Sequence, residues 1–374
     1  MEAVKSRIAC GEYVAGNKLP TEVSLAEEFN CSQITSKKAL DELEREGLVV
    51  RIKGSGSYVA EAFDRLGSGN SKNISMILPS GYLASNLMEY FYGASAMLSA
   101  QGYILHTASV NPRDNTITEG DLIQRTVQND CAGIIYYPEY DNKEIELLTV
   151  LSMNGFPIVT IDKRTEDLPI SSVVSDDYHG TYAVTKHLIE NGHKNIAFIS
   201  ATNISNVITG KKRFMGYATA LKDHGIKLRM EGIVNNYLQP LAEKQPDLYG
   251  QVDQILPLEG SQYDFFADIV GKLRKNGITA AVCVSDIVAM YIMKTCEYLG
   301  LSVPGDMSVA GFDDHAIIKR MGLSLTTVRQ DFYAIGYRAA ELLLEKIDNR
   351  AAPAKNLVFP VELIERSSSG PPTR

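Results

Sequence analysis

The sequence predicts an α/β chain in two unlike parts: a small helical head that ends in a β-hairpin, and a larger region with doubly wound parallel sheets in two lobes. Two helix-length segments and a glycine-tipped hairpin fill residues 1–61. From residue 74 onward, runs typical of buried strands alternate with helix-length segments, which indicates parallel sheets covered by helices on both faces. Between them, the Gly/Ser/Asn-rich residues 62–73 predict a flexible linker.

The head has the order helix, tight turn, helix, hairpin. Thr21 precedes the apolar residues of the first helix and can cap it. Ser32 can cap the second helix, in which Leu40 and Leu43 recur at helical spacing and must face inward. This order is that of a winged helix-turn-helix, an element that places one helix in the major groove of DNA.

Polar side chains remain on the exposed start of the second helix and beside the hairpin, where they suit base edges and phosphates. The chain carries a net charge of -8, so the overall basicity of many nucleic-acid binders is missing, which predicts modest nonspecific affinity and reliance on dimerisation. A helical hairpin for protein contacts, with solvated lysines, is the alternative interpretation. The candidate DNA contacts are Gln33, Thr35, Lys37, Lys38, Arg51, Lys53, Gly54 and Gly56.

Over about residues 3–60 the head resembles the DNA-binding domain of the GntR family. The resemblance is carried by Leu19-Pro-Thr-Glu22, Leu25-Ala-Glu-Glu-Phe29, Glu46-Gly-Leu48 and the glycine-rich wing. It implies DNA contacts by the second helix and the wing. Val23 and Gln33 stand where the family commonly has arginines, and Ser36 replaces a usual apolar residue, which leaves the operator sequence open. The helix that begins at Met1-Glu-Ala-Val-Lys5 is short for the family, so we expect either that the true start lies upstream or that the chain is cut at this end.

Composition narrows the function classes. The hydrophobic content of 45% is that of a globular protein, and no apolar run of about eighteen residues predicts a membrane span. The N-terminus lacks the pattern of a secretion signal. Five scattered cysteines without a CxxC motif indicate reduced thiols in the cytoplasm. No cluster of metal ligands is present in the sequence pattern, so neither a metal nor a cofactor is expected. Residues 367–374 are predicted to be a disordered tail.

The larger region alternates strands and helices in sequence order. Strands are predicted over 74–78, 104–108, 133–137, 157–161, 195–200, 280–284 and 308–312, and helices over 87–101, 120–128, 143–154, 180–191, 211–223 and 287–299. The repetition suggests two lobes in a region spanning 74–366. Lobe 1 is expected over about 74–171 and 331–352, and lobe 2 over about 172–330 and 353–366.

Open parallel sheets bind ligands at the carboxyl ends of their strands, so two facing lobes predict one cleft between them. A carboxylate and a guanidinium in such a cleft can form paired hydrogen bonds with vicinal hydroxyls, and tyrosine can stack on a sugar ring. The polar residues that follow strands or enter the second lobe are Tyr82, Asn86, Tyr136, Tyr137, Asp162, Arg164, Arg213, Ser285, Asp286 and Asp313.

This region resembles the LacI/GalR-type sensor domain, which is itself similar to periplasmic sugar-binding proteins. The resemblance is carried by 175–180, 187–193, Lys212-Arg-Phe-Met-Gly-Tyr217, 303–314 and Leu325-Thr-Thr-Val-Arg-Gln-Asp331. It implies effector contacts by Arg213, Ser285, Asp313 and Gln330, with Asn86 and Leu87 from the first lobe. Ser285 stands where some relatives have Asn, which leaves ligand specificity open. Asp176, Asp177 and His179 are interpreted as capping the helix that follows.

A GntR-type reader joined to a LacI-type sensor resembles the arabinose-repressor-like regulators. The resemblance implies a homodimeric repressor on an inverted repeat of double-stranded DNA, released by a neutral monosaccharide such as an arabinose- or fucose-like sugar. Two alternatives stay open: the same architecture with a corepressor such as a nucleobase, and a sugar-binding protein without a DNA role. An enzyme is not expected, because GxSxG, a GxGxxG after a strand, and a P-loop are missing, and the six histidines do not cluster.

Overall fold

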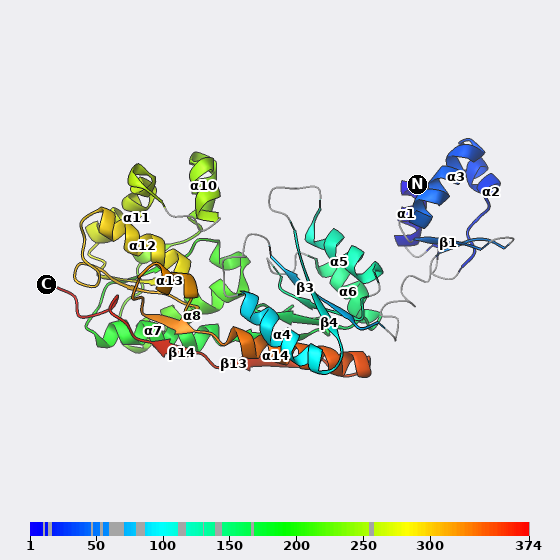
Figure 1. Ribbon diagram of the computed structural model, residues 1–374. Coiled ribbons are helices and arrows are strands. Elements are labelled where there is room, and N and C mark those ends of the chain that lie inside the picture. The colour runs from blue at the N-terminus through cyan, green and yellow to red at the C-terminus, as the bar shows by residue number, and fades with distance from the viewer. Residues whose placement is uncertain are drawn as a thin grey trace.

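The computed structural model describes residues 1–9, 12–13, 17–45, 48–52, 55–59, 71–79, 87–110, 117–129, 131–138, 144–165, 168–253 and 258–373. Figure 1 shows a small head at the N-terminal end of the chain and two α/β lobes. Within these ranges no helix is both long and apolar enough to cross a membrane. Most of the predicted linker, 62–73, lies outside the described residues, and Asn73 already belongs to a strand.

The head is the predicted winged helix-turn-helix. It contains α1 (Glu2–Ala9), α2 (Glu22–Glu28), α3 (Gln33–Arg45) and the antiparallel strands β1 (Val49–Ile52) and β2 (Gly56–Val59). Thr21 Oγ1 accepts a hydrogen bond from Ser24 N at 3.2 Å, and Ser32 Oγ accepts one from Thr35 N at 3.1 Å, so both predicted caps are confirmed. Leu40 and other apolar side chains of the helices and wing form one small core, which fixes the presented face of α3.

Lobe 1 is a six-stranded parallel sheet in the order β13-β7-β6-β5-β3-β4. Its strands are β3 (Asn73–Leu78), β4 (Ile104–Ser109), β5 (Gly133–Tyr136), β6 (Ile158–Ile161), β7 (Ser171–Ser175) and β13 (Asn356–Phe359). One hydrophobic cluster joins the sheet to α4 (Leu87–Ala100) and α14 (Phe332–Asp348), and a second joins it to α5 (Glu119–Gln128) and α6 (Ile145–Met153). Helices therefore cover both faces, as predicted (Figure 1).

Two glycines allow α4 and α14 to pack with their backbones in contact. A Cβ on Gly93 would lie 2.0 Å from the carbonyl oxygen of Tyr333, and a Cβ on Gly336 would lie 2.0 Å from that of Tyr90. Any larger residue would push these helices apart. The close packing brings Tyr90 of α4 beside Phe332 at the start of α14, with ring centroids 5.0 Å apart.

Lobe 2 is built on a four-stranded parallel sheet in the order β11-β10-β8-β9. Its strands are β8 (Ile196–Ile199), β9 (Ile233–Val234), β10 (Ala280–Cys283) and β11 (Ser308–Ala310). One face packs on α7 (Asp177–Glu190) and α8 (Ile208–Asp223), and the other on α11 (Asp264–Lys275) and α12 (Asp286–Tyr298). The short helices α9 (Leu238–Lys244), α10 (Pro246–Asp253) and α13 (Ala316–Arg320) and an antiparallel ribbon of β12 (Thr327–Arg329) and β14 (Glu362–Ile364) complete it.

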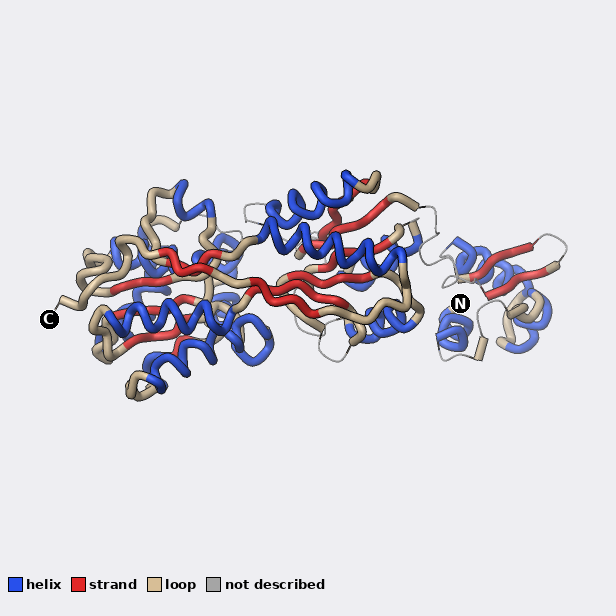
Figure 2. The backbone as a smooth tube through the Cα atoms, turned by 90° about the horizontal axis from the view of Figure 1, so that it is seen from below, coloured by secondary structure: helices blue, strands red, loops and turns tan. Residues whose placement is uncertain are grey.

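The boundary between the lobes differs from the prediction. The sequence predicts that residues from about 172, and again 353–366, belong to lobe 2, but β7 and β13 pair with each other in the sheet of lobe 1, with Val173 opposite Leu357. The chain therefore passes between the lobes after β7, between β12 and α14, and between β13 and β14; Figure 1 and Figure 2 show the last of these passages. Strand β13 is four residues long, lies at an edge of the sheet and exposes alternate residues, and its apolar residues 357–359 do not indicate which lobe the strand joins.

The predicted disorder of 367–374 is wrong for the residues up to 373. Ser368 is only 1% exposed. Its Oγ donates to Val309 O at 2.6 Å and accepts from Thr326 N at 2.8 Å. This polar side chain forms hydrogen bonds with buried backbone groups of lobe 2. These bonds hold the segment in place although its composition is typical of disorder.

Candidate functional site

Arg213 of α8 is the centre of a buried cluster at the carboxyl ends of the lobe 2 strands. Its Nε donates to Asp177 Oδ1 at 2.7 Å and its Nη1 to Val284 O at 2.6 Å, while Asp313 Oδ1 lies 3.5 Å from Nη1. The guanidinium carbon lies 3.8 Å from the ring centroid of Phe312, and the side chain is 8% exposed. These contacts fix the planar guanidinium in one orientation.

Asp313 connects this cluster to the passage between β12 and α14. Gln330 Nε2 donates to Asp313 Oδ1 at 2.6 Å. Burial raises the pKa of Asp313 to about 7, although Arg213 and the hydrogen bond from Gln330 act in the opposite direction. Burial likewise raises the pKa of Asp177 to about 6 against the effect of Arg213. The carboxylates of the cluster are therefore held with little contact to water.

Ser285 and Asp286 follow β10 but have different surroundings. Ser285 is half-buried and is the residue before α12, without a capping side-chain hydrogen bond. Asp286 is 1% exposed, accepts from His315 N at 2.6 Å and accepts a short hydrogen bond from the Thr327 hydroxyl. A Cβ on Gly311 would lie 2.3 Å from Asp286 Oδ1. Asp286 thus ties the loop after β11 to the start of α12, and Ser285 stays a candidate for a ligand contact.

Lobe 1 contributes a second set of polar groups. Asp162 directly follows β6 and has a left-handed φ of 66°, and its Oδ2 accepts from Lys163 Nζ at 2.8 Å. The same Nζ lies 4.2 Å from the ring centroid of Tyr137. Tyr90 is 0% exposed, and its hydroxyl has no hydrogen-bond partner among the described residues. Its pKa is raised well above the ordinary range by burial and then by Asp162 and Asp313, so it is close to carboxylates of both lobes.

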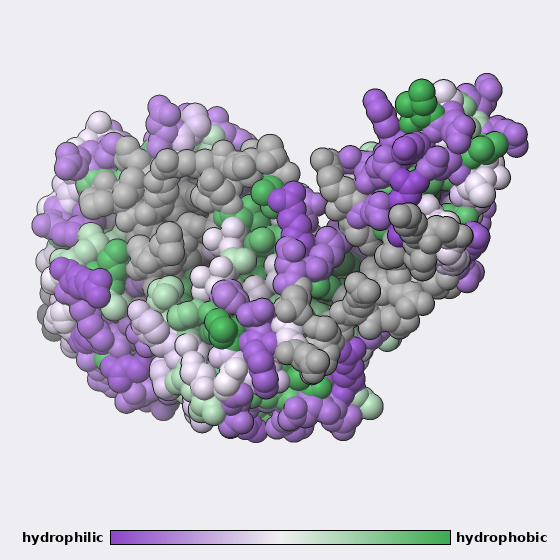
Figure 3. Space-filling model, turned by 45° about the vertical axis from the view of Figure 1, so that its right-hand side comes forward, coloured by the Kyte–Doolittle hydropathy of each residue, from purple (hydrophilic) through white to green (hydrophobic). Residues whose placement is uncertain are grey.

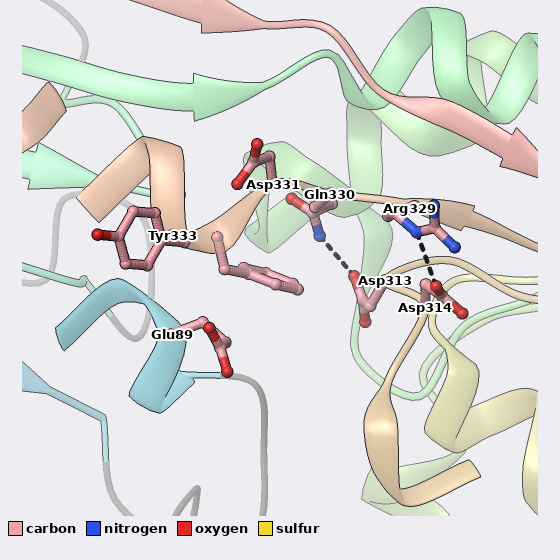
Figure 4. A pocket seen from close by; sticks show the side chains of 8 residues that line it. Glu89, Asp313, Asp314, Arg329, Gln330, Asp331 and Tyr333 are labelled. Carbon is pink, nitrogen blue, oxygen red and sulfur yellow. Dashed lines mark hydrogen bonds and ion pairs between the residues drawn. The ribbon is translucent and has the colours of Figure 1, made fainter. Parts of the chain in front are cut away.

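A pocket of about 200 Å³ opens where these parts meet. Figure 4 shows its lining side chains, which come from α4, from the loop after β11, and from the segment between the end of β12 and the start of α14. The lining residues are Glu89, Asp313, Asp314, Arg329, Gln330, Asp331, Phe332 and Tyr333.

The structure brings three predicted residues into contact, namely Arg213, Asp313 and Gln330. On the lobe 1 side, Tyr137 and Asp162 both contact the ammonium group of Lys163. Arg164 is half-buried, and Leu87 belongs to the hydrophobic core. Tyr82 and Asn86 lie outside the described residues. Tyr136 lies away from the cleft, since it packs with α5 and α6, where its hydroxyl donates to Glu119 at 3.4 Å. Binding of an effector by the predicted residues stays a prediction.

Asp177 was interpreted as a cap, and that interpretation is wrong. Its neighbour Asp176 caps α7, since Asp176 Oδ1 accepts from His179 N at 3.1 Å. Asp177 instead turns inward to the guanidinium of Arg213. Tyr90 was also missed, although it lies one helical turn after the candidate Leu87, on the same face of α4.

The predicted DNA contacts in the head are mostly exposed. Gln33, Lys37 and Lys38 point to solvent, as does Thr35, whose hydroxyl lies 2.8 Å from Ser32 Oγ. Figure 3 shows a mainly hydrophilic surface on the head, interrupted by isolated hydrophobic side chains. Ile34 at the start of α3 is 71% exposed and is suited to contact the methyl group of thymine.

In the wing, a residue predicted to contact phosphates is already paired with acidic side chains. Arg51 forms ion pairs with Glu22 and Asp41, so its guanidinium already has carboxylate partners. Gly56 has a φ of 124°, and a Cβ there would lie 2.7 Å from Lys18 Cε. Lys53 and Gly54 lie outside the described residues.

Comparison with known proteins agrees with this architecture. Residues 1–59 match the bacterial regulatory proteins of the gntR family. Residues 71–237 match the periplasmic binding proteins and sugar binding domain of the LacI family, and residues 185–369 match the periplasmic binding protein-like domain.

Relatives align over most of the chain. The arabinose metabolism transcriptional repressor of Geobacillus stearothermophilus is 27% identical over 98% of this chain and 96% of its own length. The HTH-type transcriptional regulator reg1 of Streptomyces lividans is 30% identical over 73% of each chain. Among solved structures, a LacI family transcriptional regulator from Mycobacterium smegmatis has a TM-score of 0.63 and 25% identity over 80% of this chain and 100% of its own. The complex of the transcriptional regulator CelR with cellobiose has a TM-score of 0.63 at 19% identity over 94% of this chain and 100% of its own.

These relatives are transcriptional regulators, which confirms the prediction of a regulator and not an enzyme. The chain belongs to the bacterial transcriptional regulators in which a gntR-family DNA-binding domain is joined to a LacI-type, periplasmic-binding-protein-like sensor domain.

Proposed function

We propose that this protein represses carbohydrate-utilisation genes in the cytoplasm and is released from its operator by a neutral monosaccharide, an arabinose- or fucose-like sugar. The observation that carries the proposal is the buried cluster of Arg213, Asp177, Asp313 and Gln330 beside the hydroxyl of Tyr90, which has no hydrogen-bond partner among the described residues. Relatives that span nearly the whole chain are named arabinose metabolism repressors, which supports this class of ligand.

The charges of the site favour a neutral polyol over an anion. In the described part of the cleft, three carboxyl groups with side chains at most 17% exposed accompany two buried cations: Asp162, Asp177 and Asp313, with Lys163 and Arg213. Sugar hydroxyls can donate to a carboxylate and accept from a guanidinium at once, which makes such pairs strong readers of vicinal diols. A phosphate or carboxylate ligand would instead add negative charge to an acidic site.

The passages between the lobes supply the coupling to DNA. Gln330 lies in the connection between β12 and α14 and donates to Asp313, so a ligand held by Asp313 would act directly on a segment that joins the lobes. We expect the sensor to form a homodimer that presents two α3 helices to an inverted repeat. The edge strand β4 and the neighbouring α4 support this, since they expose Ile104 at 58% and Tyr92 at 53%.

Isothermal titration against a panel of free sugars and sugar phosphates tests the ligand. L-arabinose or a fucose should bind, and the phosphates should not. Binding of sugar phosphates with no response to free sugars would contradict the proposal. A gel shift with the DNA upstream of the protein's own gene then gives the sign: the sugar should weaken the complex, whereas a corepressor would strengthen it.

A further inference from the structure

Asp314, the residue after the candidate ligand carboxylate Asp313, is held by three cations. Its Oδ2 accepts from Lys319 Nζ at 3.0 Å and from Arg329 Nε at 2.8 Å, and its Oδ1 accepts from Arg366 Nη2 at 2.5 Å. Lys319 and Arg329 are about half exposed, at 51% and 45%, whereas Arg366 is 18% exposed and Asp314 is 5% exposed. Because water screens the other two pairs more strongly, the pair with Arg366 is the dominant one.

The backbone makes the position of Asp313 depend on that of Asp314. Both residues have positive φ: Asp314, at 51°, lies in the left-handed helical region that aspartate tolerates, whereas the 120° of Asp313 lies outside it and indicates that surrounding contacts hold the backbone there. Figure 4 shows their side chains diverging, Asp313 towards Gln330 and Asp314 towards Arg329. If the carboxylate of Asp314 were released from its cations, the backbone of this turn would relax, and the carboxylate of Asp313 would lose its present orientation.

Arg366 is itself fixed, although it lies 52 residues further along the chain. Its Nη1 donates to Leu325 O at 2.7 Å, and its backbone N donates to Thr326 Oγ1 at 2.9 Å. Two residues further on, Ser368 is buried and donates to Val309 O in β11. The C-terminal segment is therefore anchored to β11, which precedes the turn of Asp313 and Asp314, and to the residues just before β12.

We propose that Arg366 is a positioning residue of the effector site: without contacting the ligand, it holds Asp314 and so aims Asp313 into the cleft. This rests on the proposed function only in the assignment of Asp313 to ligand binding. The C-terminal segment is then part of the sensing machinery.

Hydrogen–deuterium exchange tests the positioning without any ligand. In Arg366→Met, which keeps an unbranched apolar stem but removes the charge, the peptide covering 311–316 should exchange faster while the remaining lobe 2 peptides keep their rates. Arg366→Lys should restore much of the protection. The matched control is Arg338→Met on α14, which breaks an ion pair with Glu341 away from the turn and should leave 311–316 unchanged.

Unchanged exchange over 311–316 in Arg366→Met would overturn the proposal, as would a uniform increase throughout lobe 2 in both Arg366→Met and the isosteric Asp314→Asn. The second variant keeps the test decisive if the first folds poorly, because Asp314→Asn must show the same local effect.

A double-mutant cycle on sugar affinity then tests the route through Asp313. Arg366→Met should raise the Kd at least about tenfold in the wild-type background, but by less than about twofold in an Asp313→Asn background. Equal losses in both backgrounds would show that Arg366 acts independently of Asp313. If the wild-type protein binds no sugar, the proposed function fails, while the exchange result still decides the positioning role.

Discussion

Replacement of Arg213 by methionine tests the energetics of the buried cluster. The substitution fills much of the volume of the side chain but leaves Asp177, 3% exposed, without its cation, and Val284 O without its donor. Removing one partner of a buried ion pair destabilises a protein by about 3–5 kcal/mol, because the remaining charge is uncompensated. We expect a loss of that size for Arg213→Met near pH 8, which is roughly half of a typical unfolding free energy.

The loss should depend on pH with a definite sign. Burial raises the pKa of Asp177 to about 6 in the folded protein, above its ordinary value of 3.8, while Arg213 lowers it. A carboxyl with a raised folded pKa stabilises the fold below the unfolded value, and that contribution disappears as pH rises through the folded value. Loss of Arg213 raises the folded pKa further, so the penalty should shrink at about pH 5 by about 1.4 kcal/mol per unit of that rise.

Urea unfolding followed by far-UV circular dichroism at both pH values measures the penalty, since the chain has no tryptophan. The double variant Asp177→Asn/Arg213→Met is the control, because it removes the stranded charge and should be more stable than Arg213→Met alone near pH 8. A penalty that is independent of pH, or that grows at low pH, would refute this account of the cluster.

Three further substitutions have distinct expected outcomes. Tyr90→Phe removes a hydroxyl without a partner in the described residues, so the unfolding free energy should change by less than about 1 kcal/mol while sugar affinity in calorimetry falls about tenfold. In DNA-binding titrations, Lys37→Ala should weaken all sequences alike and lower the salt slope by about 1, whereas Gln33→Ala should relax base preference; a uniform loss for Gln33→Ala would contradict its role. Gly93→Ala places a Cβ 2.0 Å from the backbone of α14 and should destabilise lobe 1 by about 1–3 kcal/mol. Gly271→Ala adds a Cβ with no atom of the described residues within 4 Å and should stabilise by up to about 1 kcal/mol; thermal unfolding that ranks the two alike would refute the packing argument.

Local chemistry explains what could be predicted from the sequence. Thr21 and Ser32 cap their helices through residues three positions away, so a short stretch of sequence contains the whole interaction. The apolar runs of β3 and β6 identify central strands for the same reason. Arg213 and Asp313 lie 100 positions apart, so no local pattern predicts their contact. That contact was expected only from the resemblance to a known sensor domain.

The unpredicted features depend on contacts between distant segments. Asp176 and Asp177 both suit a helix cap, and only the position of Arg213, 36 residues away, turns the second one inward. Ser368 lies in a segment whose composition is typical of a disordered tail, and its partners are backbone groups of the distant residues Val309 and Thr326. The pairing of β13 with β7 joins residues more than 180 positions apart, so the hydropathy of this segment does not show which sheet it joins.

The central claim is that ligand binding in the cleft changes the affinity of the head for DNA. Fluorescence anisotropy with the labelled DNA upstream of the protein's own gene, titrated with and without L-arabinose or a fucose, tests it most directly. The account predicts that saturating sugar raises the Kd for this DNA by about 5- to 150-fold, the range of typical allosteric coupling. A sugar that binds the protein but leaves this Kd unchanged would contradict it.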